Sequence, residues 1–180
     1  MKLGEEHADL DDIDRQILAL MQENCRLPLA KIGEKVGLSA PSVMERVKKL
    51  EDGGIITAYR AIVNARLLGK DITAFIGVST GHPHAIDTFE HEIGLLDDVL
   101  ECHHVTGTHT LILKAKTRNT SSLEELISRI RSIEGVVRTE TMVVLSTHTE
   151  RFQVPVVEHP PVTKRGRRAA EKALHLKGVH

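Results

Sequence analysis

The sequence predicts an α+β protein, with an N-terminal winged helix-turn-helix joined to a C-terminal ferredoxin-like βαββαβ domain. Two observations predict this fold class. Three short amphipathic segments come first, and a single glycine, Gly37, separates the second from the third. Residues 72–146 then alternate between strand-like and helix-like patterns in the order β-α-β-β-α-β.

The N-terminal part is predicted to hold three helices and a strand. The first covers residues 11–24, with an apolar stripe of Ile13, Ile17, Leu20 and Met21. The second follows Pro28 and ends at Gly37, the residue type best suited to a left-handed cap. The third begins at the N-cap Ser39, with a stripe of Val43, Val47 and Leu50. Residues 55–63 are rich in β-branched side chains and predict the strand of a wing.

The C-terminal part is predicted to hold four strands and two helices. Strands are expected over residues 72–80, 99–105, 110–116 and 136–146. Helices are expected over residues 84–98 and 120–135, the second of them capped by Ser121 or Ser122. Prolines at 155, 160 and 161 exclude a central strand over residues 154–162. The tail is expected to be disordered or partner-dependent, with a possible short helix at 169–176.

Charge and composition restrict the possible functions. Residues 1–70 contain eleven Lys or Arg and eleven Asp or Glu. Residues 71–150 contain six Lys or Arg against twelve Asp or Glu, and residues 151–180 contain seven Lys or Arg against two Asp or Glu. With one Tyr, three Phe and no Trp, aromatic platforms for single-stranded nucleic acid are almost excluded. Two distant cysteines without a CxxC pair suit a reducing compartment. An acidic N-terminus and the lack of any run of 18 apolar residues predict a cytoplasmic protein that does not enter a membrane.

The tight turn at Gly37 indicates DNA binding. It braces the third helix across the second, so that one face of the third is free to enter the major groove of double-stranded DNA. Residues near the start of such a helix meet base edges, and basic residues further along meet phosphates. The predicted DNA-binding residues are Ser39, Ala40, Ser42, Glu45, Arg46, Lys48, Lys49 and Arg60. Of these, Ser39, Ser42, Glu45 and Arg46 are expected at base edges, and Lys48, Lys49 and Arg60 at phosphates. In the tail, Lys164, Arg165, Arg167 and Arg168 either add non-specific phosphate contacts or are simply solvated.

Three stretches carry a resemblance to a known family: the segment "GLSAPSVMERVKKLEDGGIITAYRAIV", the "VTG" hairpin at residue 105 and the strand "RTETMVVL". The chain resembles the leucine-responsive/asparagine-synthesis regulator (Lrp/AsnC) family over roughly residues 9–153. The resemblance implies a transcription regulator that forms a homodimer through its ferredoxin-like domain and often assembles into octamers. It also implies an amino-acid effector at the interface between regulatory domains. The domains expected are DNA-binding at 9–64, a linker at 65–71, regulation and oligomerisation at 72–153, and a basic tail at 154–180.

The expected effector residues are Gly107, Thr108, His109, Thr110, Thr139 and Thr141. Family members commonly carry Gly-Asp-x-Asp in the hairpin, where an acidic side chain can hold a ligand ammonium group. This hairpin has no carboxylate, and hydroxyl groups cannot supply the missing countercharge. The ligand has therefore changed or been lost. Simple β-propensity explains Thr139 and Thr141 equally well.

Other classes of function have weaker signals. Seven histidines fall in the middle domain, but neither they nor Cys102 show a recognised metal spacing, and no metal or cofactor is expected. Those histidines could instead make assembly respond to pH. No GxSxG, HExxH or P-loop motif occurs, so an enzyme is not predicted. The alternatives are a decarboxylase of sirohaem-type tetrapyrroles, since such enzymes resemble the same two-domain family, and a protein-interaction module that uses the regulatory domain alone.

Overall fold

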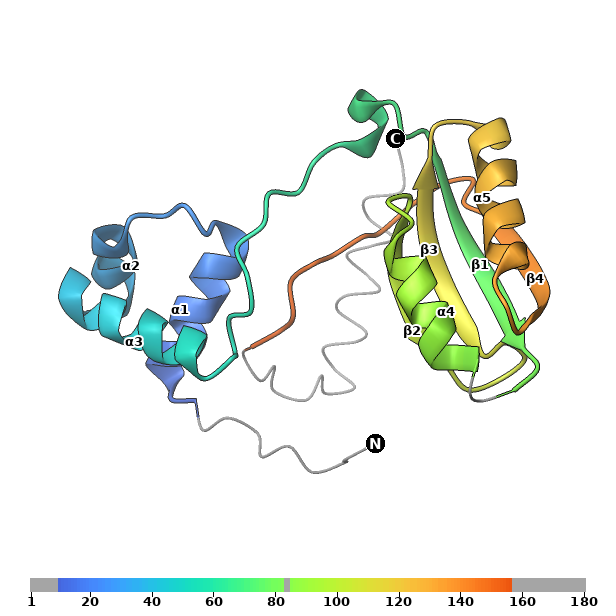
Figure 1. Cartoon of the computed structure of the whole chain (residues 1–180). Coiled ribbons are helices and arrows are strands. Elements are labelled where there is room, and N and C mark those ends of the chain that lie inside the picture. The colour runs from blue at the N-terminus through green and yellow to red at the C-terminus, as the bar shows by residue number, and fades with distance from the viewer. Residues whose placement is uncertain (1–9, 83–84, 157–180) are drawn as a thin grey trace, which may run out of the picture. The chain divides into compact units, whose positions relative to one another are not determined.

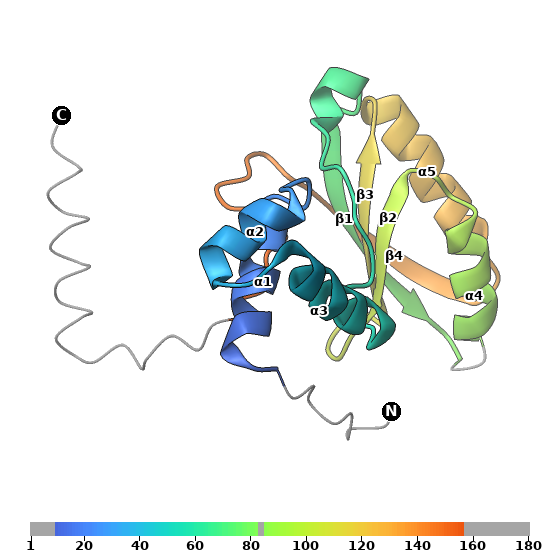
Figure 2. The same cartoon turned by 90° about the vertical axis from the view of Figure 1, so that its left-hand side faces the viewer.

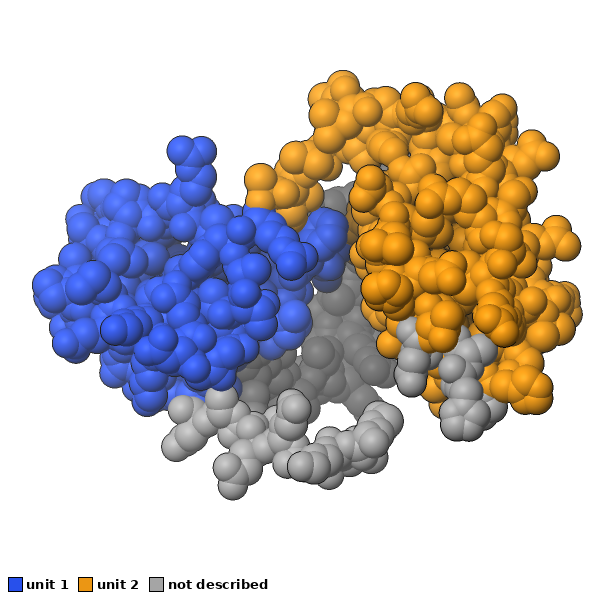
Figure 3. Space-filling model, in the orientation of Figure 1, with its two compact units in different colours: residues 1–60, 151–180 blue, residues 61–150 orange. Residues whose placement is uncertain are grey.

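The computed structural model describes residues 10–82 and 85–156 (Figure 1). These residues form two compact units (Figure 3). We call the first, residues 10–60 with 151–156, the helical unit, and the second, residues 61–82 with 85–150, the sheet unit. Helices come first and a mixed sequence of strands and helices comes after them, so the predicted α+β class is confirmed.

The helical unit contains α1 (Asp12–Glu23), α2 (Leu29–Val36) and α3 (Ala40–Asp52). Helix α1 begins with a capping box, in which the Asp14 amide donates to Asp11 Oδ1 at 2.8 Å and the Asp11 amide donates to Asp14 Oδ2 at 3.4 Å. Helix α2 ends at Gly37, whose φ of 73° is the left-handed conformation expected of a glycine cap. Helix α3 begins behind Ser39, whose Oγ accepts from the Ser42 amide at 3.3 Å.

The core of the helical unit joins all three helices. Its buried side chains are Ile17, Leu18, Ile32, Val43, Val47 and Leu50. The chain after α3 adds Ile55 and Ile56 to this core. The predicted wing strand over 55–63 is wrong, because none of these residues is assigned to a strand. The described part of the helical unit offers no strand with which they could pair, so the β-branched side chains at 55 and 56 serve packing instead.

The sheet unit is built on four strands, β1 (Ile72–Thr80), β2 (Val99–His104), β3 (Leu111–Thr117) and β4 (Val136–Val143). Their order is β2-β3-β1-β4, and every neighbouring pair is antiparallel. Helices α4 (Ala85–Gly94) and α5 (Thr120–Ser132) cover one face of the sheet, and a short 3-10 helix, η1 (Ala65–Leu68), precedes β1 (Figures 1 and 2). This order is that of the ferredoxin-like unit, as predicted.

The core of the sheet unit lies between the sheet and its two helices. The buried strand residues are Ala74, Ile76, Val78, Leu111, Leu113 and Ala115. Phe89 and Ile93 from α4 and Leu123, Leu126 and Ile130 from α5 pack against them. The cap predicted for α5 is wrong, because Asn119 occupies that position. Its Oδ1 accepts from the Ser122 amide at 2.9 Å, and Ser122 Oγ accepts from the Asn119 amide at 3.0 Å. Asparagine caps as well as serine does, so Ser122 takes the reciprocal position.

Neither α4 nor α5 lies on the other face of the sheet, which we call the open face (Figure 2). Cross-strand partners share a face, so the register places Phe75 beside Lys114 and Met142 here. Phe75 is 37% exposed and Met142 is 47% exposed. In the part of the chain that the structure covers, no helix has the length and apolar character needed to cross a membrane.

Candidate DNA interface and effector region

The turn between α2 and α3 depends on two glycines. The Gly33 carbonyl accepts a hydrogen bond from the Leu38 amide at 3.0 Å, which closes the turn around Gly37. A methyl group on Gly33 would lie 2.4 Å from the Leu38 carbonyl oxygen. The sequence analysis identified Gly37 but missed Gly33. The signal that was available is a glycine inside a helical pattern, which often marks a close backbone approach.

Helix α3 divides into a buried face and an exposed face. Val43, Val47 and Leu50 are buried, which confirms the predicted stripe. The predicted DNA-binding residues Glu45, Lys48 and Lys49 are all exposed on the same helix. Ser42 and Ala40 are half-buried, and Arg60 is exposed beyond the helix. Met44, which the sequence analysis passed over, is 56% exposed and adds an apolar side chain to this surface.

Ser39 has a structural role at the start of α3. Its Oγ accepts from the Ser42 amide, and it lies 2.9 Å from Ser42 Oγ. Both hydroxyl groups are therefore already hydrogen-bonded at the point where α3 begins. Ser39 is still exposed, so a DNA contact would have to be made in addition to its capping bond.

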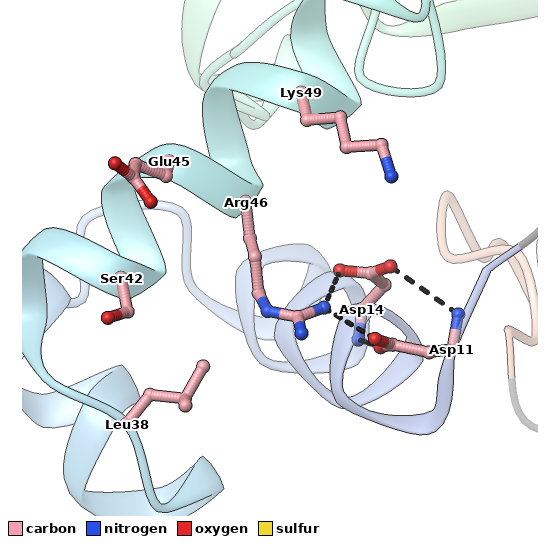
Figure 4. A pocket seen from close by; sticks show the side chains of 7 residues that line it. All are labelled: Asp11, Asp14, Leu38, Ser42, Glu45, Arg46 and Lys49. Carbon is pink, nitrogen blue, oxygen red and sulfur yellow. Dashed lines mark hydrogen bonds and ion pairs between the residues drawn. The ribbon is translucent and has the colours of Figure 1, made fainter.

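Arg46 extends from α3 to the N-terminus of α1 (Figure 4). Its Nη1 donates to Asp11 Oδ2 and to Asp14 Oδ1, both at 2.7 Å. Asp14 is only 6% exposed, so Arg46 neutralises a carboxylate that α1 keeps almost out of water. The Asp14 amide and Arg46 both donate to Asp11, and together they lower the pKa of that carboxyl. The side-chain hydrogen bonds of Arg46 to Asp11 and Asp14 raise the pKa of Arg46, and the bond to Asp11 is the larger cause.

The surface around this ion pair is a shallow hollow. It is lined by Asp11, Asp14, Leu38, Ser42, Glu45, Arg46 and Lys49. Figure 4 shows the Arg46 guanidinium turned toward the two aspartates, whereas Glu45 points away from them. The sequence analysis placed Arg46 at a base edge, and nothing in the linear sequence showed that its partners lie more than thirty residues earlier.

Replacing Arg46 with alanine is expected to destabilise the helical unit. The change leaves Asp14 buried beside Asp11, two carboxylates without their common cation. The unfolding temperature should fall by several degrees at neutral pH. The pKa of Asp11 is lower in the folded protein than the unfolded value of 3.8. The stability that ionised Asp11 contributes to the folded state is therefore present above pH 3.8 and is lost as pH falls through the folded pKa. The variant should therefore lose less stability on acidification to about pH 3. Thermal melts at both pH values measure this.

The matched control for this prediction is Arg26→Ala, which removes an exposed arginine from the same unit. A melting temperature that falls equally in both variants would contradict a specific role for the Arg46 ion pairs. The salt dependence of DNA binding supplies a second measurement. A lost phosphate contact lowers the slope of log affinity against log salt by about 0.9. We expect no change of this size for Arg46→Ala.

The hairpin that holds four of the expected effector residues joins β2 to β3. Gly107 has a φ of 123°, which favours glycine, and Thr108 is exposed. The Thr110 amide donates to the Val78 carbonyl at 2.9 Å, and Thr110 Oγ1 accepts from the Thr80 amide at 3.2 Å. The hairpin is thus attached to β1 through Thr110.

His109 lies over Gly77 in β1. A methyl group on Gly77 would come within 2.5 Å of His109 Cδ2, so the glycine makes room for the imidazole ring. His109 Nδ1 is buried without a hydrogen-bond partner, and Nε2 lies 3.6 Å from Glu140 Oε2. Glu140 was missed by the sequence analysis. It is exposed on β4 and brings a carboxylate beside a hairpin that has none of its own.

Thr139 and Thr141 share one face of β4, but it is not the face that carries His109. Their cross-strand partners are Val78 and Ile76, both fully buried under the helices. Gly77, over which His109 lies, alternates with those residues and belongs to the open face. Of the six predicted effector residues, His109 therefore lies on the opposite side of the sheet from Thr139 and Thr141. No group of three or more His, Cys, Asp or Glu side chains suited to a metal ion occurs within residues 10–82 and 85–156.

Comparison with known protein families supports both domains. Residues 10–51 match the AsnC-type helix-turn-helix domain, and residues 73–154 match the Lrp/AsnC ligand binding domain. An HTH-type transcriptional regulator of Pyrococcus furiosus is 34% identical over 149 residues, which is 82% of this chain and 97% of the relative. The regulatory protein AsnC of Escherichia coli is 33% identical over 151 residues, 81% of this chain and 97% of the relative.

Solved structures agree with these relatives. A transcriptional regulator of Neisseria meningitidis in complex with L-Met has a TM-score of 0.79 at 29% identity, covering 82% of this chain and 97% of that one. A feast or famine regulatory protein of Mycobacterium tuberculosis, complexed with L-methionine, has a TM-score of 0.76 at 29% identity, covering 81% and 98%.

These comparisons confirm the predicted function class. The relatives reported above are regulators, and they give no support to the decarboxylase alternative. The helix-turn-helix, the ferredoxin-like sheet unit and the order in which they follow one another agree with the same conclusion. The chain belongs to the Lrp/AsnC family of DNA-binding transcription regulators.

Proposed function

We propose that this regulator reads double-stranded DNA with the exposed face of α3 and changes its assembly when an amino acid or other small effector binds to the sheet unit. The observation that carries the first part is the division of α3. Its apolar stripe is used up by the core of the helical unit, while Glu45, Lys48 and Lys49 remain in solvent. A helix of this kind fits the major groove of B-form DNA, which is about 12 Å wide.

The residues of α3 take different roles in this proposal. Ser42, Met44 and Glu45 lie in the first half of the helix, where side chains reach base edges. Glutamate accepts from cytosine, and an apolar side chain contacts the methyl group of thymine. Lys48, Lys49 and Arg60 neutralise phosphates. To Arg46 we assign a positioning role, because the two aspartates that it contacts fix α3 against the start of α1.

A dimer is proposed to form through the open face of the sheet. Phe75 and Met142 lie side by side there and are partly exposed, and neither helix of the sheet unit covers them. Exposing apolar side chains to water in the middle of a sheet is unfavourable for a monomer, whereas contact with a second copy would remove them from water. Two copies related by a two-fold axis would present two α3 helices to half-sites one helical turn, or a multiple of it, apart. Octamers or other higher assemblies would extend this arrangement.

The effector is proposed to be an amino acid, because two of the similar solved structures are complexes with L-methionine. Glu140 supports this proposal, because it provides beside His109 the carboxylate that the hairpin lacks. A carboxylate can pair with a ligand ammonium group in a site from which water is removed. A ligand would act by binding one assembly state more tightly than another. A cytoplasmic location remains a prediction.

Footprinting of genomic fragments tests this function, with each of the twenty common amino acids added in turn. We expect protected half-sites spaced by about 10 base pairs or a multiple, and at least one amino acid that changes both the footprint and the oligomer measured by light scattering. Protection without any preferred sequence would contradict specific reading by α3. An unchanged oligomer in all twenty additions would contradict the effector proposal and leave the DNA proposal standing.

A further inference from the structure

The chain after α3 folds back onto the end of that helix without forming a strand. Gly54 has a φ of 69°, the left-handed conformation that lets the chain leave the direction of the helix. The amides of Ile55 and Ile56 then both donate to the Leu50 carbonyl, at 2.9 and 3.1 Å. Their side chains pack against the core of the helical unit. The backbone is therefore fixed to α3 as far as Ile56.

A single side-chain hydrogen bond attaches the next residues to α3. Within the part of the chain that the structure describes, no backbone hydrogen bond involves residues 57–60. The Tyr59 hydroxyl donates to Glu51 Oε1 of α3 at 2.7 Å. We call this bond the latch. It holds the segment to α3 in place of the backbone ladder that the expected wing strand would have formed.

The latch is partly shielded from water. Tyr59 is 49% exposed, and burial, followed by the hydrogen bond to Glu51, raises the pKa of Tyr59 to about 12. The phenol therefore keeps its proton at neutral pH and remains the donor. A tyrosine hydroxyl has one proton to donate, and the latch uses it. Tyr59 is consequently unable to donate to a DNA phosphate while the latch is closed, so the geometry favours a role through its neighbours.

The latch ends on one particular side of α3. Residues three apart on a helix are neighbours on its surface, so Glu51 lies beside Lys48, whereas Lys49 is turned from Lys48 by about 100°. This side therefore carries one of the two lysines that are proposed to neutralise phosphates. Arg60 follows Tyr59 directly in the chain and is exposed. Holding Tyr59 against Glu51 keeps the backbone of Arg60 near the same side of the helix.

We propose that the latch between Tyr59 and Glu51 positions Arg60, so that its guanidinium meets a DNA phosphate on the Lys48 side of α3. The inference deepens the proposed reading of DNA by α3 and rests on it. A segment that is already ordered loses less conformational freedom when DNA binds, so a preformed position of Arg60 increases affinity. Tyr59 and Glu51 are positioning residues in this scheme, and Arg60 makes the contact.

A double-mutant cycle in the full chain tests the latch. Its members are Tyr59→Phe, which keeps the ring and removes only the hydroxyl, Arg60→Ala, and the two changes together. Thr57→Val removes a hydroxyl from the same exposed segment and is the matched control. Affinity for a duplex that contains the footprinted site is measured between about 50 and 300 mM salt. A thermal melt of each variant shows whether it is folded.

We expect Arg60→Ala to weaken binding about fivefold near 0.15 M salt and to lower the slope of log affinity against log salt by about 0.9, because one phosphate contact is lost. Tyr59→Phe should weaken binding about two- to fivefold, the range for one hydrogen bond. In the Arg60→Ala background it should have no further effect, since the residue that the latch positions is gone. Thr57→Val should bind DNA as the parent chain does.

Two variants of Glu51 give a measurement that a general loss of structure would not. Glu51→Gln and Glu51→Ala both remove the negative charge, but only glutamine keeps an oxygen that can accept from Tyr59. Glu51→Gln should therefore bind DNA about two- to fivefold more tightly than Glu51→Ala, and adding Tyr59→Phe to each should abolish this difference.

Intrinsic fluorescence reports the latch directly, because the chain has one Tyr and no Trp. A hydrogen bond to a carboxylate quenches tyrosine emission, so both Glu51 variants should emit more than the parent chain at neutral pH. Unchanged emission in both would contradict the latch.

Three binding results would also overturn the latch. The first is a Tyr59→Phe variant that binds DNA like the parent chain while Arg60→Ala binds more weakly. The second is an equal loss from Tyr59→Phe with and without Arg60, which would mean that Tyr59 acts independently of that arginine. The third is an unchanged slope in Arg60→Ala.

Failure of the latch is separable from failure of the proposed function. Changing Lys48 and Lys49 together to alanine must still weaken binding if α3 reads DNA, whatever the Tyr59 and Arg60 variants do. A full chain that shows no salt-dependent binding at all would defeat both proposals.

Discussion

Replacing Gly33 with alanine is expected to distort the helix-turn-helix and weaken DNA binding at least tenfold. An added methyl group would lie 2.4 Å from the Leu38 carbonyl oxygen. The methyl group is attached directly to the backbone of α2, and the oxygen is part of the backbone of the turn. Neither can rotate away as the end of a side chain could. The hydrogen bond from the Leu38 amide to the Gly33 carbonyl, now 3.0 Å, would lengthen as the turn moves. Because α3 begins immediately after this turn, the displacement passes directly to the DNA-binding face.

Two opposing energies decide the sign of this prediction. Alanine is favoured over glycine in the interior of a helix by about 1 kcal/mol. Overpacking against a rigid neighbour costs about 1–3 kcal/mol, and a separation of only 2.4 Å from a backbone oxygen belongs at the upper end. We therefore expect a net destabilisation of about 1–2 kcal/mol by chemical denaturation, together with the loss of DNA affinity.

Gly94→Ala is the matched control for Gly33→Ala. Gly94 is the last residue of α4, and a methyl group there would meet no atom within 4 Å. It should leave both stability and DNA binding nearly unchanged. If Gly33→Ala were as stable as the parent chain and bound DNA equally well, the turn could not be the rigid brace that the geometry describes.

Local signals made most of the helical unit predictable. The buried stripe of α3, the left-handed cap at Gly37 and the N-cap Ser39 all follow from residue type and spacing. The strand order of the sheet unit follows as well, because alternating strands and helices of these lengths have few ways to close a sheet. The cap of α5 was predicted at Ser121 or Ser122, whereas the structure shows Asn119 as the N-cap in a reciprocal capping box with Ser122.

Long-range contacts explain what the sequence could not show. The Arg46 ion pairs span 32 and 35 residues, and the bonds between Gln22 and Val154 span more than a hundred. No periodicity links such positions. A basic residue on a predicted recognition helix therefore suggested DNA, although its guanidinium is directed to Asp11 and Asp14. The missing wing strand has the same origin, since β-branched residues form a strand only where a partner strand exists.

The effector region shows most clearly which features the sequence could not predict. The hairpin departs from the family's acidic motif, so the sequence indicated only a changed or lost ligand. The fold adds Glu140 from a different strand and separates His109 from Thr139 and Thr141. Which side of a sheet a hairpin residue occupies depends on the register around the turn, and one residue of slip reverses it. Tertiary structure was therefore needed to place these groups.

Changing Lys48 and Lys49 together to alanine is expected to weaken binding to any duplex by about ten- to a hundredfold near 0.15 M salt. The slope of log affinity against log salt should fall by about 1.8, because two phosphate contacts are lost. Sequence preference should be retained, since phosphates carry no direct sequence information. Both lysines are exposed, so the unfolding temperature should not change. Titrations of labelled specific and scrambled duplexes, with a thermal melt of each variant, measure these quantities.

The control for this pair is Lys31→Ala on α2, where the lysine is exposed and forms an ion pair with Glu34 at 2.8 Å. It removes a positive charge from the same unit but not from α3. If only the net charge of the helical unit mattered, Lys31→Ala would cost half as much binding free energy as the double variant, and the slope would fall in proportion. A position-dependent effect requires instead that Lys31→Ala leaves the slope almost unaltered. That outcome would show that phosphates approach the exposed face of α3 rather than the unit as a whole.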